Sequence, residues 1–184
     1  DYPRWSRINS VALSADGAWM TYAYAPNDGD STLYVRELDG DRMYEVINGS
    51  GPQFSDDSAW VGFITSPPEE AGGGRGGGGG RGGRGGRGAQ GGQSGDSQAP
   101  TRTLKLIELA SGDEHEIEDV RAFEFSGDSA FVAIHKNRAD RQAEHQGADF
   151  VLRSLETGMA LNIGNVSQFS FNEDASLLAY LVDA

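Results

Sequence analysis

The chain of 184 residues contains no cysteine, which excludes a disulfide scaffold, a thiolate zinc site and a cysteine nucleophile. No apolar run approaches the roughly 18 residues that a membrane-spanning helix needs, so we expect no membrane contact. The sequence as given starts at Asp1, without an initiator Met, a basic n-region or an apolar h-region. We therefore expect the sequence to be a processed or excised piece of a longer protein.

Motifs for catalysis and metal binding are equally scarce. A serine nucleophile elbow needs G-x-S-x-G at a strand-to-helix turn, and the nearest strings, Asn48–Gly51 and Gly92–Gly95, lack that spacing. The only histidines, His115, His135 and His145, do not stand at ligand spacing from one another. We expect no catalytic residue, no metal and no cofactor in this chain.

Acidic residues outnumber basic ones, 28 to 15, and the net charge of -13 disfavours a nucleic-acid partner. Residues 71–100 differ, because they hold 16 of the 27 glycines and four arginines. Such a segment cannot bury enough apolar surface to offset its ordering entropy, so we predict a disordered insertion. It resembles an RNA-binding Arg/Gly box but has no aromatic residue. A solvated loop is the favoured interpretation, with weak docking of its arginines onto acidic patches left open.

A repeat organises the rest of the chain. Four short turn segments, "SADG", "SDDS", "SGDS" and "NEDA", centre on Asp16, Asp57, Asp128 and Asp174, at spacings of 41, 71 and 46 residues. The insertion accounts for the excess in the middle spacing, which leaves a period in the forties. Such a period is typical of a repeat architecture.

The flanks of these turns agree position by position. Three residues after each aspartate the side chain is large, and five after it is fairly small: Trp19, Trp60, Phe131 and Leu177, then Thr21, Gly62, Ala133 and Ala179. The small residue indicates close approach of a neighbouring sheet, and the recurrence of Trp19 and Trp60 indicates core packing. Each repeat thus predicts an alternating strand, a Ser/Asp turn and a continuously apolar strand.

Third strands are predicted at 33–38, 104–109 and 150–155, and fourth strands at 42–47, 114–117 and 159–163. Four antiparallel strands per repeat of this length are typical of a β-propeller blade, and we favour this fold over a β-sandwich. We predict an all-β chain that forms a partial propeller of about three and a half blades. Residues 1–70 hold a lead-in, blade 1 and half of blade 2; the insertion spans 71–100; residues 101–184 complete blade 2 and add blade 3 and half of blade 4.

The turn "SADG" followed by "AWMTYAY" resembles the repeats of TolB-like proteins and of prolyl-oligopeptidase-type serine peptidases. The opening, with Tyr2–Trp5 leading into the first blade, is similar to large bacterial peptidases of that family, and "GSGPQFSDDSAWVGFIT" matches their second blade. Only the first turn keeps Asp-Gly. The resemblance implies a propeller that covers a C-terminal α/β-hydrolase domain and admits short peptide substrates. It also implies a periplasmic or secreted protein.

Two alternatives stay open: a TolB-like propeller that binds a protein partner without catalysis, and, more weakly, an RNA-associated protein. The connection 136–147 is the longest non-repetitive stretch besides the insertion, and loops of this kind often carry function on a rigid scaffold. Arg138 and Arg141 within it are our candidate site residues, as contacts to substrate or to the hydrolase domain. A plain surface connection is the competing interpretation.

Overall fold

Strands alone make up the regular structure of this computed structural model, which describes residues 5–68, 101–138 and 147–183. Its thirteen strands are β1 (Ser6–Leu13), β2 (Trp19–Pro26), β3 (Thr32–Glu37), β4 (Met43–Ile47), β5 (Gly49–Phe54), β6 (Trp60–Thr65), β7 (Thr103–Glu108), β8 (Glu114–Ile117), β9 (Val120–Phe125), β10 (Phe131–Lys136), β11 (Ala148–Ser154), β12 (Ala160–Phe171) and β13 (Leu178–Val182). The all-β prediction is confirmed. The predicted disordered insertion, 71–100, lies outside the described residues.

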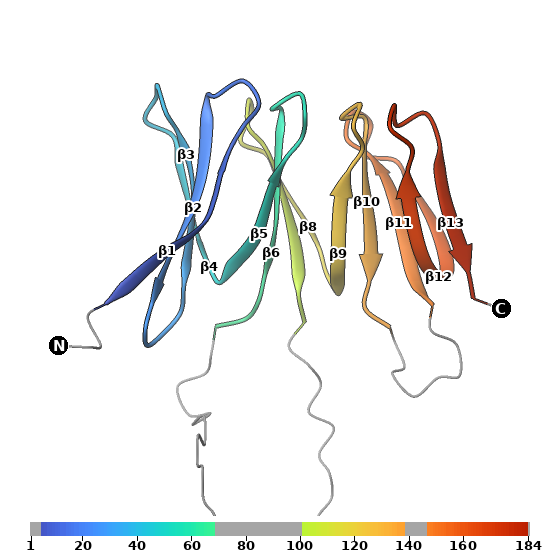
Figure 1. The fold of residues 1–184 in the computed structure, drawn as a ribbon, viewed down its shortest axis with the longest axis horizontal. Helices are drawn as coiled ribbons and strands as arrows, with labels where there is room; N and C mark the ends of the chain where they lie inside the picture. The colour runs from blue at the N-terminus through green and yellow to red at the C-terminus, as the bar shows by residue number, and fades with distance from the viewer. Residues whose placement is uncertain (1–4, 69–100, 139–146, 184) are drawn as a thin grey trace, which may run out of the picture.

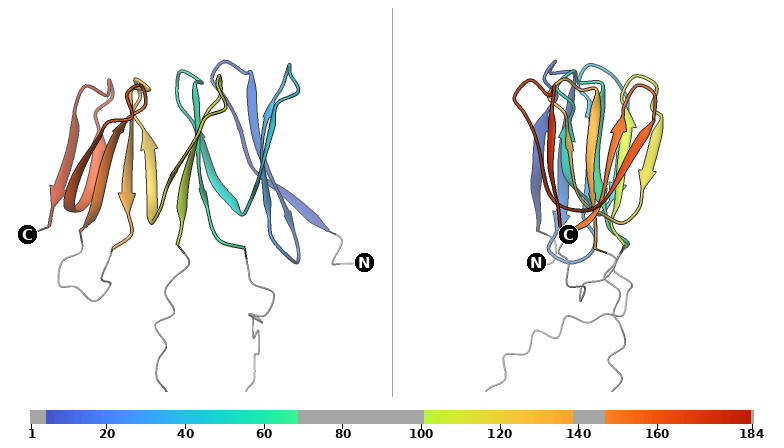
Figure 2. Two further views of the ribbon diagram at one scale, coloured as in Figure 1. Left: turned by 180° about the vertical axis from the view of Figure 1, so that it is seen from behind. Right: turned by 90° about the vertical axis from the view of Figure 1, so that its right-hand side faces the viewer.

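The strands form three antiparallel sheets that stand side by side in a row (Figure 1). Blade 1 has the order β1-β2-β3-β4 and blade 2 the order β5-β6-β7-β8. Figure 2 shows the sheets one behind another when the row is viewed end-on. Neighbouring blades contact each other through their first strands, β1 with β5 and β5 with β9. This is expected where first strands line a propeller axis, so the partial propeller is confirmed.

The third sheet departs from the prediction, because it joins blade 3 to the start of blade 4. We expected a short fourth strand at 159–163 and a separate strand after it. Instead β12 is continuous: Ala160–Val166 pairs with β11 of blade 3, and Val166–Phe171 pairs with β13. A single left-handed residue, Asn165, with φ of 59°, turns the chain here without ending the strand.

Each Ser/Asp turn is closed by the same short hydrogen bonds. In the first turn the Ser14 hydroxyl donates to the Asp16 carboxylate at 2.5 Å and accepts from Trp19 N–H at 2.9 Å. Ala18 N–H donates to the same carboxylate at 2.9 Å. Equivalent bonds close the turns at 55–60 and 126–131. The hydroxyl bond is the main reason that the pKa of Asp16 lies below its usual value.

Apolar layers between the sheets form the core. Trp19, Leu33 and Val35 of blade 1 pack against Val61 and Phe63 of blade 2, so the core role of Trp19 is confirmed. A second layer joins blades 2 and 3 and contains Trp60, Leu104, Leu106, Phe123, Val132 and Ile134.

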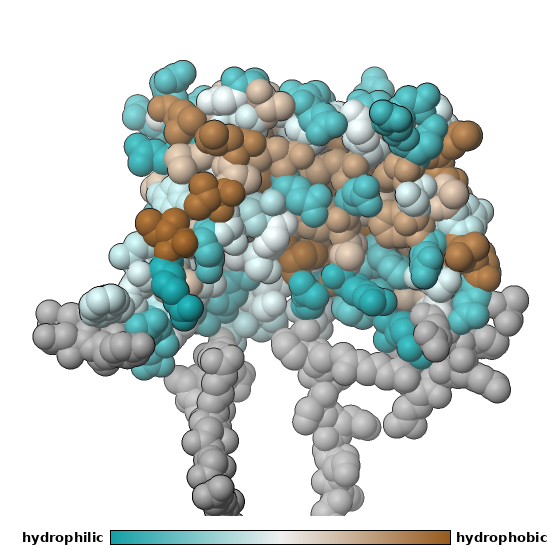
Figure 3. Space-filling view, viewed as in Figure 1, coloured by the Kyte–Doolittle hydropathy of each residue, from teal (hydrophilic) through white to brown (hydrophobic). Residues whose placement is uncertain are grey.

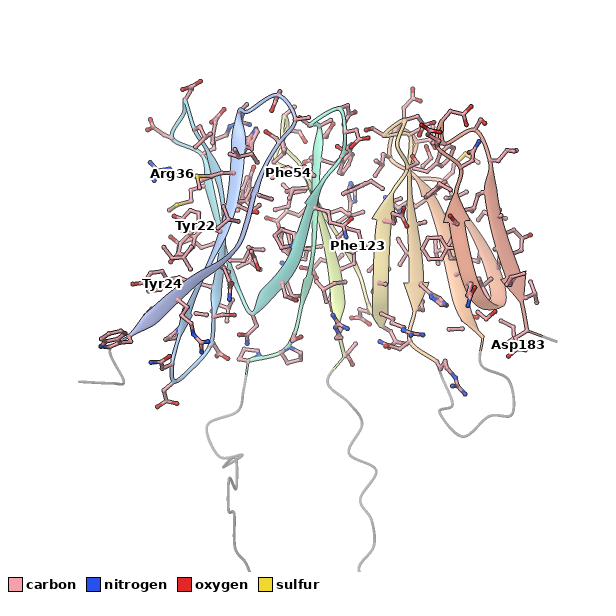
Figure 4. All side chains as sticks on the ribbon, viewed as in Figure 1. Tyr22, Tyr24, Arg36, Phe54, Phe123 and Asp183 are labelled. Atoms are coloured by element: carbon pink, nitrogen blue, oxygen red, sulfur yellow. The ribbon has the colours of Figure 1, made fainter. Side chains whose placement is uncertain are left out.

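The recurrent small residue has the predicted cause. A Cβ on Gly62 would lie 2.6 Å from Cε2 of Phe123 in the next sheet; Figure 4 labels Phe123. Thr21 and Ala133, at the same repeat position, are fully buried. Close approach of two sheets therefore limits the side chain at this position.

Apolar side chains stay exposed on the outer sheets at both ends of the row (Figure 3). On blade 1 the exposed fraction is 63% for Ile8 and 58% for Ile47, and on β13 it is 60% for Leu181. Tyr22 stacks on Tyr34 on the outer face of blade 1, at a centroid distance of 5.0 Å. Exposed apolar residues gathered on a sheet face are typical of a surface that packs against a further partner.

Candidate functional surface

The long connections all leave the blades at one rim, the lower one in Figure 1. They join the second strand of a blade to its third: 27–31 in blade 1, 66–102 in blade 2 and 137–147 in blade 3. The Ser/Asp turns lie at the opposite rim. Since functional loops gather on one end of a rigid scaffold, we take the rim of the long connections as the candidate functional surface.

Three residues with a left-handed backbone conformation, which we call the corner residues, lie where one blade passes into the next, beside the ends of these connections. Asn48, Asp119 and Asn165 have φ values of 54°, 62° and 59°, and each stands nine residues before a turn aspartate. Asn48 donates through Nδ2 to Asp30 Oδ1 at 2.8 Å, which ties its corner to the first connection. Asn137 donates to Asp119 through its side chain at 3.0 Å and its main chain at 2.9 Å. These ties set where each connection leaves its blade.

Sequence reasoning did not identify the corners, although a signal was present. Asn, Asp and Asn recur at one repeat position, and these are the non-glycine residues that most readily adopt a left-handed conformation. Blade 1 has Arg7 there instead. Asn165 is tied to Asp183 through the Asp183 N–H and carbonyl, and Figure 4 shows Asp183 on the same rim.

The two predicted site residues fare differently. Arg138 lies on the candidate surface, half-buried, directly after Asn137. Its position is therefore set by the bonds of Asn137 to Asp119. Arg141 lies outside the described residues, as do the four arginines of the insertion.

Two of the three histidines behave as structural residues, and His145 lies outside the described residues. His115 packs on Trp60 at a centroid distance of 5.8 Å, and His135 Nε2 lies 2.9 Å from the Val166 carbonyl oxygen. Trp5 is exposed at 69%. Across residues 5–68, 101–138 and 147–183 no group of three or more His, Asp or Glu could hold a metal ion. The same residues contain no helix that could cross a membrane.

Two grooves open between the blades. One, of about 700 Å³, is lined by β4 of blade 1 and by Lys105, Glu114 and Glu116 of blade 2. Lys105 is 2.6 Å from Glu116, whose hydrogen bond is the main cause of the raised pKa of the lysine. The other groove, of about 650 Å³, lies between blades 2 and 3 and is lined by Trp60, Glu108 and Arg153 among others.

An arginine fills the junction between blades 1 and 2 at the turn rim. Arg42 donates to both oxygens of Glu37, at 2.8 and 2.9 Å, and to the Leu109 carbonyl of blade 2 at 2.6 Å. Its guanidinium carbon lies 4.8 Å from the centre of the Trp19 ring. The bidentate bond lowers the pKa of Glu37 and raises that of Arg42. Arg42 thus clamps two blades together.

The sequence matches no protein-family model and no curated protein. Solved structures do resemble the fold. The β-propeller domain of the Trilobed protease from Pyrococcus furiosus has a TM-score of 0.53 at 13% identity, over 87% of this chain and 43% of that one. A prolyl endopeptidase structure gives 0.55 at 13% identity, over 94% and 25%. A eukaryotic initiation factor gives 0.51 at 9% identity, over 96% and 36%.

These similarities establish the class: the chain has the fold of a β-propeller, like the propeller domain of a protease. The chain spans less than half the length of each of these structures. At such low identity the resemblance defines the fold alone, and the activity of the whole protein is a separate question.

Proposed function

We propose that this chain is the non-catalytic propeller segment of a serine peptidase of the prolyl-oligopeptidase type. In the whole protein it covers the active site of a C-terminal α/β-hydrolase domain and admits only short, unstructured peptides. The observation that carries the proposal is the radial row of blades, whose turn and opening motifs resemble that family. The exposed apolar faces of blade 1 and β13 fit further blades that would complete a ring.

The selection is steric. A rigid ring has an opening too small for a folded substrate, so exclusion rather than chemistry sets the specificity. Tight packing between the blades supports this role, because a barrier selects by size only if its walls do not part. The Arg42 clamp and the buried Trp19 and Trp60 layers supply that rigidity.

Arg138 has a place in this proposal as a contact to substrate or to the hydrolase domain, together with Arg141. The support for Arg138 is its position on the rim that carries the long connections. Replacing both arginines by alanine in the whole enzyme should raise KM for peptides and leave thermal stability unchanged. Unchanged peptide kinetics would remove these two residues from the site.

The alternative is a TolB-like propeller that binds a protein partner and has no enzyme attached. The similarity to a eukaryotic initiation factor does not separate the two functions, because at 9% identity it shows the fold alone. From the family resemblance we also expect the peptidase in the periplasm or outside the cell, and fractionation of the source cells tests this expectation.

One experiment separates the two functions. The full-length protein is treated with a fluorophosphonate that labels activated serines, and its hydrolysis of peptides of increasing length is then measured. The peptidase proposal expects one labelled serine and a rate that collapses once the substrate is long or folded. Absence of any labelled serine supports the binding propeller, and equal cleavage of short peptides and folded proteins contradicts the steric mechanism.

A further inference from the structure

The groove between blades 2 and 3 repeats the walls of the Arg42 pocket but contains no arginine at the equivalent position. Each residue that holds Arg42 in the first junction has a counterpart in the second at the same repeat position: Trp60 for Trp19, Glu108 for Glu37, His115 for Tyr44, Leu155 for Leu109 and Glu156 for Ala110. The Trp60–His115 pair also keeps the geometry of Trp19–Tyr44, with centroid distances of 5.8 and 6.1 Å and interplanar angles of 32° and 28°.

Main-chain hydrogen bonds confirm this register. Glu37 N–H donates to the Arg42 carbonyl at 3.0 Å, and Glu108 N–H donates to the Asp113 carbonyl at 2.9 Å. Asp113 therefore occupies the position of Arg42. Its exposed carboxylate carries the opposite charge, so blade 2 supplies no guanidinium of its own.

The wall from the next blade is matched as well. Leu109 N–H donates to the Ala59 carbonyl at 2.8 Å, and Leu155 N–H donates to the Ala130 carbonyl at 2.9 Å. The carbonyl that binds Arg42 in the first junction thus has its counterpart in Leu155. Between these walls the groove has a volume of about 650 Å³, which is room for a side chain that none of the described residues provides.

The charges in the groove favour a cation. Asp57, Glu108 and Glu156 line it against a single arginine, Arg153. Glu108 accepts a bond from the Ser111 hydroxyl on Oε2 at 2.6 Å. Its Oε1 has no hydrogen-bond donor among the described residues, whereas both oxygens of Glu37 bind Arg42.

We propose that this groove is a binding site for the guanidinium group of an arginine side chain in a peptide partner. The guanidinium stacks on Trp60, donates in bidentate fashion to Glu108 and reaches the carbonyls of Leu155 and Glu156. Arginine is preferred to lysine because the planar guanidinium can stack on the indole ring and, at the same time, donate two parallel hydrogen bonds to the carboxylate. The site lies at the turn rim, opposite the long connections, so it does not depend on the proposed peptidase function.

Fluorine NMR of the full-length protein labelled with 5-fluorotryptophan tests the site, with the Trp60 signal assigned through Trp60→Phe. The probe is N-acetyl-arginine methylamide, with the citrulline and lysine analogues as controls. The arginine probe should shift the Trp60 signal saturably, the lysine probe more weakly and the citrulline probe not at all. Loss of one charged, bidentate partner in Glu108→Gln should weaken binding about tenfold. Glu118→Gln, which removes an exposed carboxylate at the other rim, should leave binding unchanged.

A second variant tests whether an arginine side chain of the protein itself can occupy the groove. Asp113→Arg should place a guanidinium where Arg42 stands in the first junction, abolish the response to the probe and raise the melting temperature above that of Asp113→Ala. Equal melting temperatures, or a Trp60 signal that responds equally to arginine and citrulline, would overturn the proposal. If the Trp60 signal moves when the arginines of 71–100 are changed to glutamine, an arginine of this same chain binds in the groove. That result would overturn the proposal of a separate peptide partner.

Discussion

The main-chain N–H of Asp57 donates a hydrogen bond of 3.0 Å to the Ser129 hydroxyl, 72 residues further along the chain. Asp16 N–H bonds Ser58 in the same way at 3.1 Å. Both serines have a left-handed φ, at the position where the first turn has glycine. The second and third turns thus have serine in place of the glycine of Asp-Gly, and this serine accepts a hydrogen bond from the preceding blade.

Removing the hydroxyl should loosen the junction between blades 2 and 3. Ser129→Ala keeps the left-handed residue and deletes only the hydrogen bond, so we expect a loss of about 1 kcal/mol in the free energy of unfolding. Chemical denaturation measures it. Ser170→Ala, at an exposed serine with a local bond, should change the free energy by less than about 0.5 kcal/mol. Equal effects of the two variants would show that the link between turns contributes no stability.

The close approach of Gly62 to Phe123 predicts a strong size limit. Gly62→Ala should destabilise the protein by about 1 to 3 kcal/mol, because the new Cβ forces the aromatic ring to shift. Gly127→Ala is the matched control, since a Cβ there finds its nearest neighbour at 3.8 Å. Phe123→Leu should partly rescue Gly62→Ala in a double-mutant cycle. Additive effects of the two changes would contradict the contact.

The turn aspartates predict a loss of stability in acid. The pKa values of Asp16, Asp128 and Asp174 lie below their usual value, mainly because a serine hydroxyl donates to each carboxylate. A lowered folded-state pKa adds stability that is complete above the unfolded pKa and is lost as pH falls through the folded pKa. Denaturation midpoints should therefore decrease below roughly pH 4.

The variant Asp128→Asn tests the cause of this dependence. Its amide cannot ionise, so its stability should change less with pH over the same acid range than that of the unchanged protein. Identical pH profiles for the two proteins would mean that this carboxylate is not a source of the acid sensitivity.

The Arg42 clamp predicts that lysine cannot replace arginine. Arg42→Lys keeps the charge but loses the fork that binds Glu37 and the contact with the Trp19 ring, so its melting temperature should fall. Arg36→Ala, an exposed position one strand away, serves as the control and should leave the melting temperature nearly unchanged. If the clamp depended on charge alone, Arg42→Lys would have the same melting temperature as the unchanged protein, which would contradict this prediction.

Local patterns made most of the fold predictable. The turns around Asp16, Asp57 and Asp128 close on themselves within six residues, so their signature is readable in a short stretch of sequence. Gly62 was readable for the same reason, because the small residue recurs at a fixed offset from the turn.

Long-range features could not be predicted in the same way. The continuity of β12 could not be inferred from Asn165, because Asn48 and Asp119 have the same left-handed conformation and the strands end there. The bond between Asp57 and Ser129 joins turns that only the fold brings together. The Arg42 pocket draws its walls from two blades, so no single stretch of sequence contains it. On the candidate surface, the role of Arg138 stays a prediction, whereas the corner residues Asn48 and Asp119 were missed.

The structure of the full-length protein is the most direct test of the radial arrangement on which this account rests. We expect further blades to continue the same rotation about one axis, with the outer face of blade 1 covered near Tyr22 and Tyr24, and a hydrolase domain against one opening of the ring. An outer face of blade 1 that stays in solvent, or sheets that continue as a flat row without a common axis, would contradict it.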